Sequence, residues 1–193
     1  MKKLLITGFE PFGGEEINPS WEAVCRLPNE IGEYSLTKLR IPVAFGMAAK
    51  EVINLAEEIC PNAILCIGQA GGRNAVTPEL VAINLRHASI PDNSGFQPLD
   101  EPVIGGADAA YFSTLPVRKM ADAINSAGIP SHLSYSAGAY VCNDLLYTLL
   151  SHFRESETKI AFVHVPYTAE QNKEPFMNLE DIVRALEIAV ENV

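Results

Sequence analysis

Cys142 is the residue of this sequence best suited to nucleophilic chemistry, because of the position that its neighbours predict for it. Residues 131–135 (SHLSY) alternate between apolar and polar side chains, which is typical of a strand, and the small residues 137–139 favour a tight turn. From Asn143 onward, apolar residues recur at a spacing of three and four, which predicts a helix with Asn143 and Asp144 in its first turn. Cys142 is therefore expected at a strand-to-helix corner.

Such a corner favours a reactive sulfur. The thiolate is the nucleophilic form, and a free cysteine with a pKa of about 8.5 is mostly protonated at neutral pH. Backbone N–H groups and the positive end of a helix dipole stabilise the anion. The alternative interpretation is an inert buried cysteine, the commoner fate of a cysteine among apolar neighbours. The local pattern leaves both interpretations open.

A reactive cysteine needs a nearby base, and His164 is the histidine that best fits this role. It lies near the carboxyl end of the apolar run IAFVHVP, at the edge where ligand sites of α/β sheets gather. His152 is ten residues along the helix of Cys142, about 15 Å away at a rise of 1.5 Å per residue. His132 is expected at the opposite edge, and His87 lies in a segment without a clear position. A hydrogen-bonded core histidine is the alternative reading of His164.

A cysteine–histidine pair also requires a group that orients the imidazole, normally a carboxylate or an amide. Four carboxylates are candidates on the residues alone: Glu79, Asp92, Glu101 and Asp144. Their spacing in the sequence does not choose among them.

Strands and helices alternate along the chain, which predicts one domain, residues 1–193, with a three-layer α/β fold around a mainly parallel sheet. The expected strands are 2–8, 34–40, 63–67, 80–85, 131–135 and 160–165, and the expected helices are 19–27, 45–59, 114–128, 143–154 and 179–193. Asn18 followed by Pro19 indicates a capped helix start.

Three loops stand out between these elements. Phe9 and Phe12 lie in a turn rich in proline and glycine, where they either fold back into the core or line a pocket. The segment 68–73 (GQAGGR) lacks the spacing of a dinucleotide-binding fingerprint, so its glycines are expected to allow a close approach of the backbone. The stretch 90–106 has many turn signals and reads as a long functional or interface loop.

Composition narrows the class of protein further. The 193 residues are 48% hydrophobic, and 14 basic against 24 acidic residues give a formal net charge of −10, which argues against nucleic acid or an anionic membrane as a partner. No apolar run reaches the length of a membrane span, so a cytoplasmic protein is expected. Cys25, Cys60 and Cys66 lack metal-type pairing with one another or with Cys142 and are expected in the core or at its boundary.

With these residues in view, the chain resembles the pyroglutamyl peptidase I family of cysteine peptidases over nearly its full length. The resemblance rests on several specific stretches in the same order: GFEPFGGEEINPSW, GQAGGR, VTPELVAIN, IPDNSGFQPLDEPV, YFSTLP, SAGAYVCN and FVHVPYTAEQ. It implies that Glu79, Cys142 and His164 are the catalytic residues. The role of Glu79 comes from the resemblance alone, whereas the other two agree with the reading of the residues.

The resemblance also implies a pocket for the pyroglutamyl ring of a peptide substrate, and a homotetramer. Phe9 and Phe12 fall where the family clasps the ring, and Asn18, Gln69 and Val141 fall near it. Aromatic walls with a few polar groups suit a flat, neutral lactam, whereas an ordinary N-terminal ammonium would be costly to bury there. The implied reaction proceeds through a thioester and requires no metal or cofactor.

Two departures from the family pattern bear on the reaction rate. The family commonly has a basic residue after the catalytic glutamate, where this chain has Leu80, and an arginine directly before its IPDN-type stretch, where this chain has Ser89. Arg73 or Arg86 would be the available substitutes. Ala139 and Tyr140 also differ from the common Thr and Phe.

Three other functions compete with this expectation. The first is a pyroglutamyl-peptide binder whose turnover is weak or lost because of Leu80 and Ser89. The second is another Cys-His-Glu amidohydrolase, although the corner lacks the G-x-C-x-G elbow expected by analogy. The third is a structural or assembly protein in which the loop 90–106 is an interface.

Overall fold

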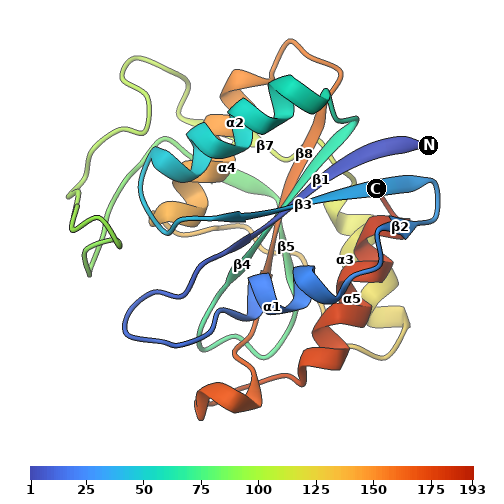
Figure 1. Ribbon diagram of the computed structural model, residues 1–193. Coiled ribbons are helices and arrows are strands. Elements are labelled where there is room, and N and C mark those ends of the chain that lie inside the picture. The colour runs from blue at the N-terminus through green and yellow to red at the C-terminus, as the bar shows by residue number, and fades with distance from the viewer.

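The chain folds around a twisted six-stranded sheet with helices on both faces (Figure 1). A computed structural model describes all residues, 1–193. The strands of this sheet, in their spatial order, are β2 (Glu30–Ile31), β3 (Tyr34–Ile41), β1 (Lys2–Phe9), β4 (Ala63–Gln69), β8 (Lys159–Val165) and β5 (Thr77–Glu79). The four central strands are parallel, and the two edge strands are antiparallel to their neighbours. The predicted three-layer α/β fold with a mainly parallel, mixed sheet is confirmed.

Two hydrophobic clusters separate the sheet from its helices. One lies beneath α1 (Pro19–Arg26), α3 (Val117–Ser126) and α5 (Leu179–Glu191), and the other beneath α2 (Met47–Ile59) and α4 (Val141–His152). The face of each strand residue follows from the alternation of side chains along a strand. Leu65 and Val163 face the first cluster, whereas Cys66 and Phe162 face the second. A short 3-10 helix, η1 (Ala169–Gln171), follows β8.

The regular elements with strong periodicity lie close to their predicted positions. Asn18 caps α1 through its side chain, which accepts a hydrogen bond from the Ser20 N–H at 3.1 Å, and proline occupies the first helical position. Helices α2 and α3 begin two and three residues later than predicted, at Met47 and Val117. In α2 the delay follows from Gly46, whose φ of 70° is incompatible with a helix.

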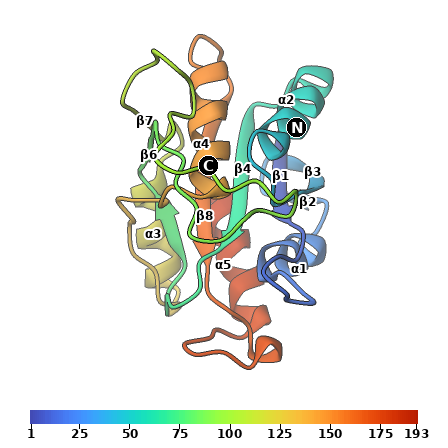
Figure 2. The same ribbon diagram turned by 90° about the vertical axis from the view of Figure 1, so that its left-hand side faces the viewer.

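The predicted strand 80–85 is wrong in its boundaries. The chain forms β5 as far as Glu79, leaves the main sheet at Leu80, and then forms β6 (Val81–Ile83), which pairs with β7 (Ala110–Phe112) in a separate two-stranded sheet. Most of the segment between β6 and β7 is irregular, as predicted for residues 90–106. Figure 2 shows this loop running across one side of the molecule, from β6 and β7 towards β3. It is fixed there by the Asn93 N–H, which donates to the Val43 carbonyl at 2.9 Å.

The predicted strand 131–135 does not form. This segment is extended, but it joins β5 only through isolated bridges, at Ser131 opposite Val76 and at Ser134 opposite Glu79. Because β5 has three residues, it offers too short a partner for a regular ladder. The helix that follows starts at Val141 rather than at Asn143, so Cys142 lies inside the first turn of α4.

No helix of the structure combines the length and the apolar character that a membrane crossing requires.

Candidate active site

The sheet places His164 and Glu79 in contact. In the antiparallel pairing of β5 with β8, Thr77 lies opposite His164 and Glu79 opposite Phe162, so Glu79 and His164 are diagonal neighbours on one face. The His164 Nδ1 and the Glu79 Oε1 are 2.6 Å apart, and both side chains are buried. Of the four carboxylates that the residues alone left open, Glu79 is the one beside His164.

The other three carboxylates do not contact His164. Asp92 accepts hydrogen bonds from the backbone N–H groups of Phe45, Ser94 and Phe96. Asp144 pairs with Arg86 at 2.6 Å, and Glu101 is exposed in the long loop. Asp92 and Asp144 thereby hold the loop and the start of α4 in place.

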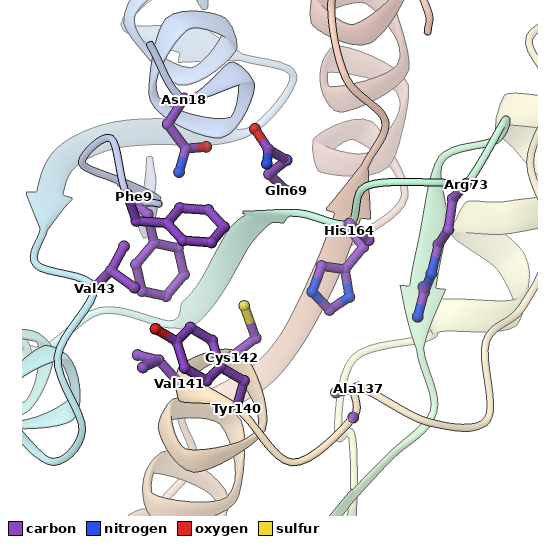
Figure 3. Close-up of a pocket in the computed structure, with 13 residues that line it drawn as sticks. Phe9, Asn18, Val43, Gln69, Arg73, Ala137, Tyr140, Val141, Cys142 and His164 are labelled. Carbon is purple, nitrogen blue, oxygen red and sulfur yellow. The ribbon is translucent and has the colours of Figure 1, made fainter. Parts of the chain in front are cut away.

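Cys142 projects from α4 towards the same face of the sheet. Gly68 is paired with His164 in the register of β4 and β8, and a Cβ atom built on Gly68 would lie 3.1 Å from the Cys142 sulfur. The sulfur therefore occupies the space that a side chain at position 68 would fill. The sulfur thus lies over β4, and the imidazole belongs to the adjacent strand, β8. Adjacent strands are about 4.8 Å apart. Figure 3 shows the thiol and the ring lining one pocket.

The first turn of α4 offers unpaired backbone donors beside the sulfur. The N-cap, Tyr140, makes no side-chain capping bond, and the first N–H of the helix with an acceptor is that of Asp144. The N–H groups of Val141, Cys142 and Asn143 precede it, as expected at a helix N-terminus. They form a place where a negative oxygen would be stabilised.

Burial dominates the ionisation of the thiol. Desolvation, with a smaller contribution from the negative charge of Glu79, raises the pKa of Cys142 to about 12, although Arg73 and the cysteine's own N–H act in the opposite direction. Burial likewise lowers the pKa of His164, against the opposing effect of Glu79. Burial therefore favours the neutral form of both the thiol and the imidazole. This effect of burial on the thiol opposes the stabilisation of the anion that a helix N-terminus provides.

Glu79 remains a carboxylate in this buried position. Burial raises its pKa, but hydrogen bonds from His164 and Arg73 outweigh that effect, so the pKa of Glu79 lies below its usual value. Arg73 donates to the Glu79 Oε1 at 2.7 Å and to the Thr77 hydroxyl at 2.5 Å. Its contact with Glu79 places a positive charge next to the carboxylate–imidazole pair.

A cavity of about 200 Å³ opens beside the sulfur. All five residues expected near a ring-binding pocket line it: Phe9, Phe12, Asn18, Gln69 and Val141. Phe9 is the last residue of β1 and is 2% exposed, so it is a strand residue rather than a loop residue. Val43, Arg73, Ala137 and Tyr140 also line the cavity and were not singled out as its lining from the sequence.

Tyr140 links this cavity to the long loop. Its ring packs on Phe12 at 6.3 Å and on Phe45 at 5.3 Å between centroids, and its hydroxyl donates to the Pro91 carbonyl at 3.1 Å. Phe45 in turn meets Phe96. The aromatic residue before Val141 was noted in the sequence only as a departure from the family pattern, and nothing there indicated its contact with the loop.

The two expected substitutes for a missing arginine differ in position. Arg73 lines the cavity, whereas Arg86 binds Asp144 and packs over the Phe45 ring. Leu80 packs against the core beneath α3, and neither it nor Ser89 lines the cavity. Arg73 is thus the only guanidinium in this pocket.

The remaining histidines and cysteines lie elsewhere. His152 contacts Glu57, and His87 contacts Asp100. The position expected for His132 is wrong: its segment runs parallel to β5 and therefore antiparallel to β8, which brings it to the Arg73 end of the sheet. Cys66 is buried as expected, but Cys25 and Cys60 are exposed. No group of three or more potential metal-binding side chains is present.

A partly exposed thiol beside a buried imidazole and a buried carboxylate, at the carboxyl edge of an α/β sheet, is the arrangement of a thiol-dependent hydrolase. The chain matches the family model described as pyroglutamyl peptidase over residues 2–193, and it belongs to that family.

Individual relatives agree with this assignment over more than nine tenths of their length. The pyrrolidone-carboxylate peptidase of Thermococcus kodakarensis is 48% identical, with 99% of this chain and 95% of the relative covered, and that of Erwinia tasmaniensis is 47% identical, with 98% and 92% covered. Among solved structures, pyroglutamyl peptidase I of Bacillus amyloliquefaciens superimposes with a TM-score of 0.95 at 42% identity, covering 100% of this chain and 96% of that one. The pyrrolidone carboxyl peptidase of Thermococcus litoralis gives 0.95 at 38% identity, with 99% and 92% covered.

Proposed function

We propose that this protein removes N-terminal pyroglutamate (5-oxoproline) from peptides, with Cys142 as nucleophile, His164 as general base and acid, and Glu79 as the group that orients His164. The observation that carries the proposal is that the thiol and the imidazole line the same cavity as Phe9 and Phe12, while Glu79 holds the far nitrogen of the imidazole. Family membership supplies the substrate class.

The protonation states that the site favours fit a general-base mechanism. Because burial favours the protonated thiol, His164 takes its proton as the sulfur attacks the carbonyl that joins pyroglutamate to the next residue. The contact of Nδ1 with Glu79 fixes that nitrogen as N–H and leaves Nε2 free to accept. The carboxylate then stabilises the imidazolium that forms. His164 returns the proton to the departing amine, and water hydrolyses the thioester with the same residue as base.

The oxyanion of the tetrahedral intermediate is stabilised by the first turn of α4. Its N–H groups, including that of Cys142, have no acceptor in the helix and lie beside the reacting sulfur. Each such donor contributes roughly 10² to 10³ in rate.

The cavity recognises the lactam through shape and a few polar groups. Phe9, Phe12 and Val141 provide apolar walls. The Gln69 side-chain oxygen accepts from Gln171 at 2.8 Å, so its amide N–H groups remain available to the lactam carbonyl. The Asn18 oxygen is occupied as a helix cap, and one of its two side-chain N–H groups donates to the Glu10 carbonyl. An ammonium group would lose its hydration here without gaining a carboxylate partner.

We further propose that residues 1–193 act as a single peptidase domain in a homo-oligomer, a tetramer by family resemblance, in the cytoplasm. Large apolar side chains stay exposed on the long loop, with Ile90 at 45% and Leu99 at 64%, which suits a subunit contact. All four cysteines are unpaired, which suits a reducing compartment. Light scattering of the purified protein tests the oligomer: a monomeric mass at micromolar concentration contradicts it.

A chromogenic pyroglutamyl anilide tests the activity. We expect the wild type to release the aniline from this anilide and Cys142→Ser to lose at least about 10³-fold in kcat, because a hydroxyl with a much higher pKa replaces the thiol. Cys25→Ser is the matched control, since Cys25 is an exposed cysteine outside the cavity and its loss leaves the rate unchanged. Thermal unfolding of all three proteins checks the fold.

Three results contradict the proposal. Binding of the anilide by the wild type without release, at any pH from 6 to 9, indicates a pyroglutamyl-peptide binder. Equal activity of the wild type and Cys142→Ser removes the sulfur from the mechanism. Release of ammonia from glutamine, with the anilide left intact, indicates an amidohydrolase of another specificity.

A further inference from the structure

A second groove lies next to the catalytic cavity and shares Arg73 with it. Its volume is about 590 Å³, and its lining consists of Arg73, His132, Leu133, Ser134, Tyr135 and Ser136. Arg73 also lines the cavity of Cys142. The cavity and the groove therefore share the Arg73 residue, and the mechanism above assigns no role to the groove.

The position of the ring pocket decides which part of a substrate faces this groove. In Figure 3, Phe9, Val43 and Tyr140 lie on one side of the Cys142 sulfur, whereas His164 and then Arg73 lie on the other. A ring held among the aromatic residues points the scissile bond towards the sulfur. The departing amine must then lie on the side of His164, which protonates it. The chain that follows this amine continues past His164 towards Arg73.

Arg73 has N–H groups without an acceptor where the cavity and the groove meet. A guanidinium carries five N–H groups. Three hydrogen bonds use them, to Thr77, to Glu79 and to the Ser136 carbonyl at 3.2 Å. The side chain is 30% exposed, so two N–H groups remain for a carbonyl of the passing peptide.

The extended segment 131–135 borders the groove with unpaired backbone groups. Its hydrogen bonds to the β5 region use the main chain of Pro130, His132 and Ser134 only. The N–H and C=O groups of Leu133 and Tyr135 have no partner, because alternate residues of an extended chain point to opposite sides. The three steps from Ser131 to Ser134 span about 10 Å, which matches two or three residues of an extended peptide. An edge of this kind is suited to main-chain recognition of a peptide.

We infer that the groove lined by Arg73 and residues 132–136 binds the two or three residues that follow the pyroglutamyl residue of the substrate. Arg73 donates to a main-chain carbonyl of this leaving peptide, and the ring of Tyr135, which is 65% exposed, packs against its side chains. The inference rests on the proposed peptidase activity, and it adds a site for the leaving part of the substrate to the site for its ring.

The test is a series of pyroglutamyl compounds that differ only in the leaving part: an anilide, then alanine amides with one, two, three and four residues. For the wild type we expect kcat/KM to rise with length up to two or three residues and to stay level beyond. In Tyr135→Ala we expect the rise to shrink by about three- to tenfold, the loss of one partly exposed contact. The ratio of the three-residue amide to the anilide is the readout, because it cancels any general change in activity.

Phe112→Ala is the matched control, since Phe112 is an aromatic residue with the same 65% exposure on β7, outside both hollows. We expect its length dependence to equal that of the wild type. A wild-type series without any rise, or equal losses on the anilide and on the amides in Tyr135→Ala, overturns the inference. If neither the anilide nor any amide is cleaved, the proposed activity itself fails.

A binding measurement separates the two proposals. Titration calorimetry of Cys142→Ser with the three-residue amide, compared with pyroglutamyl amide, measures the contribution of the leaving peptide without turnover. We expect the longer compound to bind several-fold more tightly and Tyr135→Ala in the same background to remove that advantage. Equal affinities of the two compounds for Cys142→Ser contradict the site.

Discussion

At the scale of single residues, the ionisation of the site depends on which charges reach His164. Burial lowers its pKa, the hydrogen bond and charge of Glu79 raise it, and the charge of Arg73 lowers it. Glu79 and Arg73 meet at one carboxylate oxygen, which the imidazole also contacts. Changes at these two neighbours should therefore move the pKa of His164 in opposite directions.

The pH profile of kcat/KM reports this pKa in the free enzyme. His164 must be neutral to accept the thiol proton, so activity is full above its pKa and is lost as pH falls through it. Because the pKa is lowered, the acid limb should lie below pH 6.5. We expect Arg73→Gln to move the limb to higher pH and Glu79→Gln to move it to lower pH, with a lower kcat in Glu79→Gln. Shifts in the same direction would contradict this balance.

Gly68 controls the position of the sulfur. A Cβ at this position would lie 2.6 Å from the Phe162 ring and 3.1 Å from the Cys142 sulfur, so at least one of them must move. We expect Gly68→Ala to lower kcat by about 10²-fold, the cost of a displacement of about 1 Å at a reacting atom. Steady-state kinetics and thermal unfolding are the measurements.

Gly105→Ala is the matched control, because a Cβ at Gly105 meets no atom within 4 Å. It should keep the wild-type rate. Full activity of Gly68→Ala would show that the sulfur does not depend on this space.

At the scale of elements, the first turn of α4 is positioned by buried side-chain hydrogen bonds. The Asn143 side chain accepts from the Ile83 N–H and donates to the carbonyls of Ile83 and Leu85, each at 2.9 Å. Asp144 accepts from the Gly46 N–H and from Arg86. The helix end that carries Cys142 is thereby tied to β6 and to the start of α2.

Asn143→Ala should destabilise the protein by about 1–3 kcal/mol, because it leaves the partly buried Ile83 N–H and Leu85 carbonyl without their side-chain partner. We also expect kcat to fall, since Cys142 is the preceding residue. Denaturant unfolding and the anilide assay measure the two effects. Thr148→Ala, on the partly exposed side of the same helix, is the control. An unchanged stability of Asn143→Ala would indicate that these bonds contribute nothing net.

The elements also differ in how well the sequence predicts them. The periodic segments predicted β1, β3, β4, β8, α1 and α5 closely, because burial of one face imposes the period on the sequence. The division of 77–83 into β5 and β6 was missed, since strands of three residues carry too little pattern. The sequence left Glu79 as one of four candidate carboxylates. Its contact with His164 follows from an antiparallel register that no local signal encodes. The positions of Arg73 and Tyr140 depend equally on tertiary contacts.

At the scale of the whole molecule, the mixed sheet concentrates the polar residues at one edge. Parallel strands β1, β4 and β8 bring their carboxyl ends together, and the antiparallel β5 places its amino end, preceded by Arg73, at the same edge. Phe9, Gly68 and His164 thus meet Glu79 beneath the start of α4. This arrangement buries a histidine and a carboxylate, and burial of ionisable groups costs free energy of folding.

This cost makes the stability of the fold depend on pH. The folded-state pKa values of His164 and Glu79 both lie below their unfolded values, so the unfolded chain binds more protons as the pH falls. The stability that His164 contributes is full above pH 6.5 and falls below it, and that of Glu79 is full above about pH 4.5 and falls below it. We expect the melting temperature of the wild type to decrease from pH 7 to pH 5, mainly through His164.

Replacing the histidine tests this assignment, because the net charge of −10 also changes over the same range. As pH falls, the loss of negative charge reduces repulsion and opposes the effect of His164. His164→Gln keeps a donor for Glu79 but has no proton to gain, so its melting temperature should fall less between pH 7 and pH 5 than that of the wild type. The exposed His132, replaced in the same way, is the control and should retain the wild-type slope. Identical slopes for His164→Gln and the wild type would mean that protonation of this residue is not what destabilises the protein in acid.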